Sequence, residues 1–311
     1  MHENLLRVPP NKNMEIGFVG LGKMGKGVVL HLLEKKIKVV VWNRSKDDVD
    51  EVVKFGATPA KDHKDLISKL DSPRVIWIMV PQGKPVDEMI DKLIPHVNKK
   101  DLIIDGGNSF YKDTVKRGKK LKGKVHFMDI GTSGGPKGAR NGACLMVGGT
   151  MKDYKRIEKV LKIVAAPKAL GLFGKLGAGH FAKMVHNGIE YGMMQAIAEG
   201  AGVLKKSNLN LDLAEIFRVY NNKSVIESRL VGWTEESFKE DPNLKAISSK
   251  IDSTGEGEWT INAAHELGIK VPVIEKSFEV RQKSSVESED FRDKVVSALR
   301  GKFGGHQVSK T

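Results

Sequence analysis

Two patterns of hydrophobic positions divide the chain. Up to about Gly174, short apolar runs alternate with amphipathic stretches, a pattern typical of a mostly parallel sheet with helices on both faces. After about Gly179 the strand-like runs disappear and long helical periods follow, beginning with residues 180–206. The predicted strands are EIGFVG, KVVVWN, VIWIMV, LIIDGG, VHFMDIG and CLMVGG.

The pattern predicts an α/β fold class, with an N-terminal doubly wound Rossmann sheet followed by an all-α domain. A chain of 311 residues is also long enough for two domains. We expect the boundary in the glycine-rich segment from Gly174 to Gly179, which gives domains of 1–178 and 179–311. Residues 1–13 and the final FGGHQVSKT are expected to be tails.

Composition is that of an ordinary globular protein, with 40% hydrophobic and 29% charged residues. No run is long enough to cross a bilayer and no signal sequence is recognisable, so we expect a cytoplasmic protein without a membrane partner. The single cysteine, Cys144, cannot form an intrachain disulfide, has no partner at metal-ligand spacing and is expected to be a small buried residue.

A net charge of +14 could attract nucleic acid, a membrane surface or a phosphorylated small molecule. No helix-turn-helix, zinc or RNA-binding signature accompanies this charge, so no nucleic-acid partner is expected. Charge by itself does not choose among the remaining partners.

A glycine-rich segment, GLGKMG, directly follows the first predicted strand and precedes the amphipathic stretch from Gly27 to Lys35. Glycines at this spacing permit a tight turn and let the backbone approach a pyrophosphate, which the helix N-terminus attracts. A chance glycine cluster is the alternative, and the flanking strand and helix count against it. The predicted cofactor-binding residues here are Gly20, Leu21, Gly22, Lys23, Met24 and Gly25.

The end of the second strand indicates which dinucleotide binds. An acidic residue there would bind the ribose hydroxyls of NAD, but this chain has Asn43, Arg44 and Ser45. A guanidinium suits a 2′-phosphate, so NADP is favoured while NAD stays possible. The alternative is that Arg44 only points into solvent.

Four polar residues share one face of the first long helix. Lys183, His186, Asn187 and Glu190 follow one another at helical spacing. A salt-bridged surface and a catalytic cleft both fit this stripe, and the stripe alone leaves both open.

Together with upstream segments, this helix resembles the 6-phosphogluconate dehydrogenase family, the decarboxylating enzymes of the pentose phosphate pathway and of gluconate utilization. The resemblance covers nearly the whole chain and is closest to the family's short form, which has a single helical unit. The similar segments are GLGKMG, VPQG, DGGNS, GTSGGPKGARNG, KMVHNGIEYG and GEGEWT.

The resemblance implies an oxidative decarboxylation of 6-phospho-D-gluconate to ribulose 5-phosphate and CO2. Lys183 would be the general base at the C3 hydroxyl, which requires a neutral amine although a free lysine has a pKa of about 10.4. Glu190 would protonate the enediol carbon that lost the carboxylate. Further implied cofactor-binding residues are Val80, Pro81, Gln82 and Asn108.

The substrate contacts implied by the resemblance fall into two groups. Asn108, Ser133, Gly134, Gly135, His186 and Asn187 would hold the carboxylate and hydroxyls, whereas Tyr191, Thr260 and Arg281 would hold the phosphate. Glu258 departs from the family pattern, which usually has a basic residue near the phosphate, and could pair with Lys250 or Lys270. His306 resembles a position that reaches into a neighbouring subunit's site, which implies a homodimer or homotetramer.

Two other functions remain as alternatives. A β-hydroxyacid dehydrogenase, such as 3-hydroxyisobutyrate dehydrogenase, shares the glycine loop and a lysine followed by asparagine, but a simple oxidation needs no second acid such as Glu190. His186 and the pair Glu190–Tyr191 therefore favour decarboxylation. A non-catalytic nucleotide sensor or nucleic-acid-binding protein would leave Lys183 and Glu190 unexplained.

Overall fold

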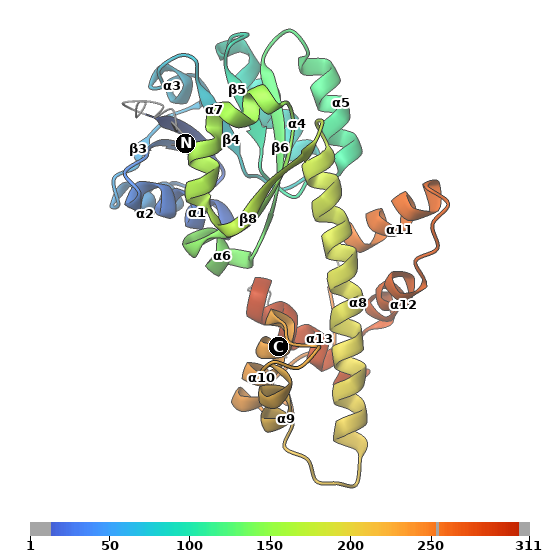
Figure 1. The fold of residues 1–311 in the computed structure, drawn as a ribbon. Coiled ribbons are helices and arrows are strands. Elements are labelled where there is room, and N and C mark those ends of the chain that lie inside the picture. The colour runs from blue at the N-terminus through green and yellow to red at the C-terminus, as the bar shows by residue number, and fades with distance from the viewer. Residues whose placement is uncertain (1–13, 253–254, 305–311) are drawn as a thin grey trace, which may run out of the picture. The chain divides into compact units, whose positions relative to one another are not determined.

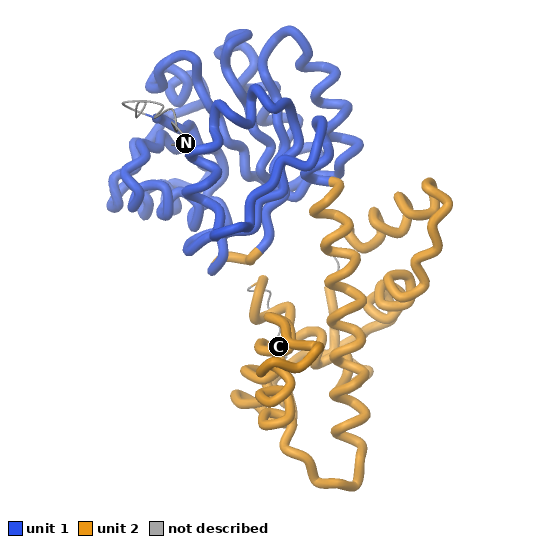
Figure 2. The backbone as a smooth tube through the Cα atoms, in the orientation of Figure 1, with its two compact units in different colours: residues 1–133, 137–180 blue, residues 134–136, 181–311 orange. Residues whose placement is uncertain are grey.

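The computed structural model describes residues 14–252 and 255–304. The chain divides into two compact units, one of residues 1–133 and 137–180 and the other of residues 134–136 and 181–311 (Figure 2). The domain limits expected from the sequence, 1–178 and 179–311, differ from these units at residues 134–136 and 179–180.

The first unit is built on one eight-stranded sheet with the order β3-β2-β1-β4-β5-β6-β7-β8 (Figure 1). Neighbouring strands are parallel, except that β6 and β7 pair antiparallel. The strands are β1 (Glu15–Val19), β2 (Lys38–Trp42), β3 (Thr58–Pro59), β4 (Val75–Ile78), β5 (Leu102–Asp105), β6 (His126–Ser133), β7 (Ala143–Gly148) and β8 (Ala165–Gly174).

The predicted mostly parallel sheet is confirmed, and all six predicted strands are present. The pattern missed β3, which has only two residues, and β8, whose sequence AAPKALGLFG is interrupted by Pro167 and Lys168. Cys144 lies on β7 and is half-buried, so the expectation of a small buried residue was wrong.

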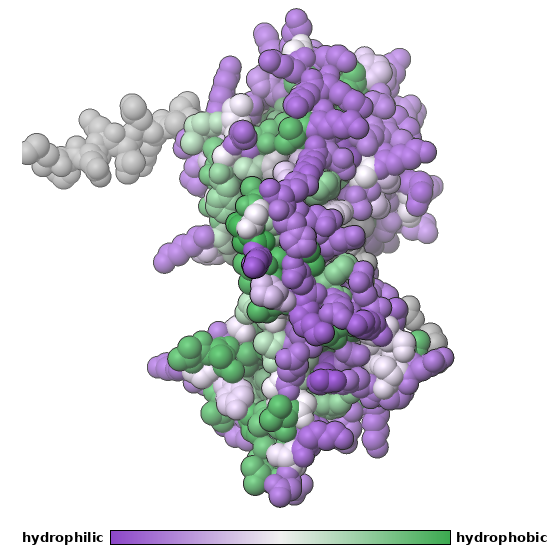
Figure 3. All heavy atoms as spheres, turned by 90° about the vertical axis from the view of Figure 1, so that its right-hand side faces the viewer, coloured by the Kyte–Doolittle hydropathy of each residue, from purple (hydrophilic) through white to green (hydrophobic). Residues whose placement is uncertain are grey.

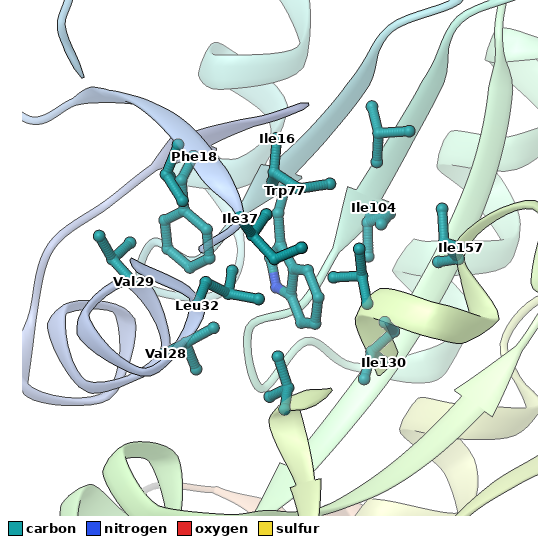
Figure 4. Packing of buried hydrophobic residues seen from close by; sticks show 14 of the residues in the cluster. Ile16, Phe18, Val28, Val29, Leu32, Ile37, Trp77, Ile104, Ile130 and Ile157 are labelled. Carbon is teal, nitrogen blue, oxygen red and sulfur yellow. The ribbon is translucent and has the colours of Figure 1, made fainter. Parts of the chain in front are cut away.

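Helices cover both faces of this sheet because alternate strand residues point to opposite sides. The helices are α1 (Lys23–Glu34), α2 (Lys46–Val53), α3 (His63–Ser68), α4 (Lys84–Leu93), α5 (Tyr111–Leu121), α6 (Gly135–Asn141) and α7 (Met151–Val164), with a short 3-10 turn at Ile94–His96. On one face Phe18 and Trp77 stack at 5.9 Å among apolar residues of α1 and α7 (Figure 4). On the other face Ile76 and Ile78 pack with residues of α3, α4 and α5.

The second unit is helical, as predicted. Its helices are α8 (Ala178–Lys206), α9 (Leu213–Tyr220), α10 (Arg229–Glu240), α11 (Glu256–Glu266), α12 (Pro272–Lys283) and α13 (Phe291–Gly304). In Figure 1, α9, α10 and α13 lie on one side of α8, and α11 and α12 on the other. Phe217, Phe238 and Leu299 lie in the core formed with the buried face of α8. No described helix is both long enough and apolar enough to cross a membrane.

Candidate functional site

The glycine loop between β1 and α1 combines close packing with one open position. Gly20 has φ +98°, and a Cβ there would lie 2.3 Å from the Met79 oxygen. A Cβ on Gly25 would lie 2.1 Å from the Gly20 oxygen, whereas a Cβ on Gly22 would meet nothing within 4 Å. Gly20 and Gly25 therefore allow the turn and the packing of α1, and the exposed backbone at Gly22 is accessible to a ligand.

The N-terminus of α1 has the features of an anion site. Gly22 offers no side chain to cap the helix, and the first turn, which begins with Lys23 and Met24, has no acidic residue. Its backbone N–H groups and the helix dipole favour a pyrophosphate, so this loop fits a dinucleotide. Leu21 has its side chain in the core and donates its backbone N–H to Asn43 Oδ1 at 3.1 Å.

Asn43 and Arg44 have different roles at the end of β2. Besides holding the Leu21 N–H, Asn43 donates from Nδ2 to the Ser45 oxygen at 3.3 Å and to Asp48 Oδ2 at 3.1 Å. Asn43 thus shapes the loop. Arg44 is exposed, and within the described residues its side chain forms no hydrogen bond or ion pair, so its guanidinium is available to an anion.

The segments after β4 and β5 pack beside the glycine loop. A Cβ on Gly20 would lie 3.1 Å from Val80 Cγ1, and a Cβ on Gly107 would lie 3.0 Å from the Val80 oxygen. Pro81 and Gln82 are exposed and Asn108 is half-buried. The fold thus brings these predicted cofactor residues together at the carboxyl edge of the sheet, where ligands bind in such folds.

The segment after β6 carries three predicted substrate residues. Ser133 is the last residue of β6, and Gly134 and Gly135 group with the helical unit. Gly135 has φ +63°, and a Cβ there would lie 1.9 Å from the Phe303 oxygen. Only glycine fits at position 135 without displacing the backbone of α13.

In the helical unit, the four polar residues of α8 form one connected cluster. Lys183 is only 7% exposed; its Nζ donates to Asn187 Oδ1 and lies 3.4 Å from His186 Nδ1. His186 Nδ1 lies 3.0 Å from Asn187 Oδ1 and 3.7 Å from Glu190 Oε2. The stripe predicted from the sequence is therefore a partly buried network rather than a row of solvated charges.

Burial sets the charge states in this network. Burial raises the pKa of the Glu190 carboxyl above its usual value, and Glu256 adds to this shift, while Lys183 and Arg281 oppose it. Burial also lowers the pKa of His186, and the neighbouring Lys183 lowers it further. Both shifts favour the uncharged form of the side chain more than an exposed position would.

Two buried arginines lie near Glu190. Arg281 is 2% exposed, and its Cζ lies 3.2 Å from the centroid of the Tyr191 ring. Burial lowers the pKa of Arg281 to about 10 and also lowers the pKa of Arg300. Within the described residues neither guanidinium forms an ion pair with a carboxylate, so an anionic ligand would satisfy both.

Sequence reasoning missed Arg300. A signal was present, because Arg300 directly follows the apolar run VVSAL and lies four residues after Val296, on the same helix face. A basic residue on the apolar face of a helix is a candidate ligand-binding residue.

Thr260 joins two helices. Its Oγ1 lies 2.8 Å from the Met184 oxygen and 2.8 Å from the Glu256 oxygen. A Cβ on Gly188 would lie 2.6 Å from Thr260, so glycine at position 188 allows α11 to approach α8. The hydroxyl proton of Thr260 is already donated to a carbonyl in this structure.

Glu258 is exposed in the first turn of α11, where the helix dipole favours a carboxylate. Across residues 14–252 and 255–304, the structure contains no ion pair between Glu258 and either Lys250 or Lys270. His306 lies outside the described residues. The same ranges contain no group of three or more His, Cys, Asp or Glu residues that could hold a metal ion.

Two family models match consecutive parts of the chain. The model described as the NAD binding domain of 6-phosphogluconate dehydrogenase matches residues 15–177. The model described as the C-terminal domain of 6-phosphogluconate dehydrogenase matches residues 179–310. Together they cover nearly the whole sequence.

Individual proteins give the same result. The chain is 42% identical to the YqeC protein of Bacillus subtilis, over 96% of this chain and 100% of that protein. It is 38% identical to the NAD(+)-dependent, decarboxylating 6-phosphogluconate dehydrogenase of Haloferax volcanii, over 96% of this chain and 99% of the other. The structure of Plasmodium falciparum 6-phosphogluconate dehydrogenase matches with a TM-score of 0.80 and 31% identity, over 93% of this chain and 64% of that longer one.

Proposed function

Because this chain belongs to the 6-phosphogluconate dehydrogenase family, we propose that it converts 6-phospho-D-gluconate to ribulose 5-phosphate and CO2 while reducing NADP. The observation that carries the proposal is the network on α8, in which a buried lysine and a carboxyl group of raised pKa share one helix face. Oxidation needs a base and enediol protonation needs an acid, and this face offers one candidate for each role. The cytoplasm is the proposed compartment.

Lys183 is the proposed general base. It takes the proton of the C3 hydroxyl as hydride leaves C3, and the bound nicotinamide supplies the hydride acceptor. The product is a 3-keto acid. Its C1–C2 bond then breaks with release of CO2, the electron pair forms an enediol, and protonated Lys183 returns its proton to the C3 oxygen. The bond from Lys183 to Asn187 supports this role because it fixes the direction of the amine.

Glu190 is the proposed acid for the last step. It donates a proton to the carbon that carried the carboxylate while Lys183 takes the proton of the C3 hydroxyl, which leaves the C3 carbonyl and completes ribulose 5-phosphate. The raised pKa of Glu190 supports this role because the carboxyl group keeps its proton at a higher pH than an exposed glutamate does. His186 and Asn187 are the proposed contacts for the substrate hydroxyls on the same face, and Asn108, Ser133, Gly134 and Gly135 complete the set.

Arg281 and Arg300 are the proposed phosphate ligands in the helical unit. Both are buried cations without a carboxylate partner among the described residues, and Tyr191 stacks on the first. A phosphate would form charge-assisted hydrogen bonds with both guanidinium groups. Thr260 supports the site by joining α11 to α8. Its hydroxyl group can donate to a phosphate only if its hydrogen bond to a backbone carbonyl breaks.

The proposed cofactor site is the glycine loop, with Gly22, Lys23 and Met24 at the pyrophosphate and the loops at Val80–Gln82 and Asn108 beside it. Arg44 is the proposed ligand of a 2′-phosphate, which would favour NADP over NAD. Its exposed position and lack of a protein partner within the described residues support this role.

We also propose a homodimer in which a second copy covers an apolar groove of about 660 Å³ on the helical unit. Ile189, Met193, Ala196, Gly200 and Val203 follow each other along α8 at alternating spacings of four and three residues, and all are exposed. Apolar residues at this spacing form the seam along which one helix packs against a similar helix. In a two-fold symmetric dimer, this seam on α8 would pack against the same seam of the second copy. Figure 3 shows apolar side chains exposed on the helical unit between hydrophilic ones.

A direct assay tests the proposed reaction. Incubation with NADP and 6-phosphogluconate should produce NADPH absorbance and CO2 in equal amounts. Lys183→Ala should abolish both signals, whereas Lys205→Ala, which removes an exposed lysine at the other end of α8, should leave them unchanged. Oxidation of unphosphorylated hydroxy acids without CO2 release would instead support a β-hydroxyacid dehydrogenase.

A further inference from the structure

A buried carboxylate on β6 binds the start of α8. Asp129 is fully buried; its Oδ1 accepts the Gly177 N–H at 2.7 Å and its Oδ2 accepts the His180 N–H at 2.8 Å. The first N–H groups of a helix have no partner within the helix and need an acceptor from elsewhere. Asp129, a residue about 50 positions earlier in the chain, supplies that acceptor for α8.

The backbone around Asp129 is packed closely enough to exclude other side chains. A Cβ on Gly148 of β7 would lie 2.3 Å from Asp129 Oδ1 and 2.7 Å from the Gly179 nitrogen. A Cβ on Gly179 would lie 2.4 Å from the Met146 oxygen. Glycine at both positions lets the first turn of α8 lie directly against β7 and the carboxylate.

His180 ties the same turn to another helix. Its side chain is 1% exposed, and its Nδ1 lies 2.7 Å from Thr114 Oγ1 of α5 and 3.9 Å from Asp129 Oδ2. Burial raises the pKa of Asp129, so a carboxylate at this position costs free energy that its two backbone bonds partly offset. Together β6, β7 and α5 hold the first turn of α8 at several points.

We propose that Asp129 is a positioning residue: it fixes the first turn of α8 and thereby the face of that helix that begins with Lys183, three residues beyond His180. The inference rests on the proposed function, in which Lys183 and Glu190 on this face are the reacting groups. A displacement of about 1 Å between reacting groups can reduce a rate about a hundredfold. The contacts that bind substrate and dinucleotide lie on other residues.

The test is Asp129→Asn, which keeps the shape but replaces one of the two acceptor oxygens with an NH2 group. We expect kcat to fall at least tenfold, while KM for 6-phosphogluconate and the dissociation constant of NADP stay within threefold. Amide hydrogen exchange in residues 174–184 should become faster. Hydrogen exchange needs no substrate, so it tests the anchoring by Asp129 independently of activity. If the wild-type protein fails to oxidise 6-phosphogluconate, the proposed function is refuted, but the anchoring can still be tested.

Asp101→Asn is the matched control. Asp101 is also fully buried and accepts the backbone N–H groups of Arg74 at 2.7 Å and Asn98 at 2.9 Å, at the amino end of β5. Both variants should lose stability, but only Asp129→Asn should lose kcat and protection at residues 174–184. Equal losses of kcat in the two folded variants, or unchanged kcat in Asp129→Asn, would overturn the proposal.

A second pair of variants applies if Asp129→Asn does not fold. Thr114→Val removes the hydroxyl group that bonds His180 Nδ1, and Thr114→Ser retains it. For Thr114→Val we expect a severalfold lower kcat and faster amide hydrogen exchange at residues 174–184. For Thr114→Ser we expect kcat and exchange rates like those of the wild type. Equal values for valine and serine would contradict the anchoring role of this turn.

Discussion

At Glu190, burial raises the pKa of a carboxyl group, whereas Glu199 lies exposed nine residues further along the same helix. The two residues have the same intrinsic chemistry, and only their surroundings differ. A glutamate whose pKa is raised keeps its proton to a higher pH and can then serve as an acid. The tertiary environment therefore selects the proposed acid.

Replacing Glu190 tests this selection. For Glu190→Gln we expect kcat to fall about 10²- to 10⁴-fold, the usual contribution of a general acid, with KM changed less than about threefold. The acid acts in its protonated form, so wild-type kcat should decline as pH rises through the raised pKa, and the variant should lack that decline. A pH series of kcat measures both effects. Glu199→Gln should behave like wild type, and a Glu190→Gln enzyme of normal kcat would rule out the assigned role.

Arg44 is the residue on which the cofactor preference depends. For Arg44→Ala we expect kcat/KM with NADP to fall about 10- to 100-fold, because a charge-assisted hydrogen bond contributes about 1.5 to 3 kcal/mol. The value with NAD should change less than twofold. Steady-state kinetics with both cofactors measure the ratio, with Lys46→Ala as a neighbouring exposed control. An equal decrease in kcat/KM with both cofactors would show that Arg44 does not bind the 2′-phosphate.

At the scale of elements, glycines and buried charges determine how closely helices and strands approach. Gly188 lets α11 pack on α8, and Gly135 lets the backbone after β6 approach α13. The pattern of apolar residues predicted the long elements because their periodicity persists over several turns or strand residues. It missed β3 and β8, since pairing with neighbouring strands, rather than local hydrophobicity, makes them strands.

The first turn of α13 contains a carboxyl group that should destabilise the fold at neutral pH. Asp293 is 8% exposed, and burial, with a contribution from Asp290, raises its pKa to about 6. The pKa of Asp293 is higher in the folded protein than in the unfolded chain. The protonated Asp293 therefore stabilises the fold fully below about pH 3.8, and this contribution is lost as pH rises through about 6. Asp293→Asn should therefore be more stable than wild type at pH 8, by up to about 3 kcal/mol, and equal to it at pH 3.5.

Urea unfolding at both pH values measures this difference. Asp290→Asn is the opposite control: its hydrogen bond to Arg292 lowers the pKa of Asp290, so its removal should reduce stability at pH 8. If the Asp293→Asn protein is less stable than wild type at pH 8, the ionised carboxylate of Asp293 stabilises the fold and the prediction is wrong.

At the scale of the whole molecule, the apolar groove on α8 is the feature that a single chain leaves unexplained. Val203 is 72% exposed and Met193 42% exposed, on a helix whose opposite face is in the core. Contiguous exposed apolar surface of this kind usually marks an interface. A second copy would remove it from water.

Val203→Glu should convert the dimer to a monomer, because the dimer would then bury an unpaired carboxylate from each copy in the apolar seam. Sedimentation velocity measures the change. Phe55→Glu, at an apolar residue 61% exposed in the first unit, should leave the dimer intact. A wild-type protein that is a fully active monomer would contradict both the dimer and the shared site expected from His306.

The sequence by itself determined the features that depend on the order of neighbouring residues along the chain. These are the alternation of strands and helices, the GLGKMG turn and the stripe from Lys183 to Glu190. Periodicity and glycine spacing are properties of neighbours along the chain, so they can be seen without a fold. Only the tertiary structure decided that Arg300 lies near Glu190, that Thr260 bonds to α8 and that Asp129 caps the same helix. Those groups come from separate elements, and burial shifts their charge states only after the elements have packed.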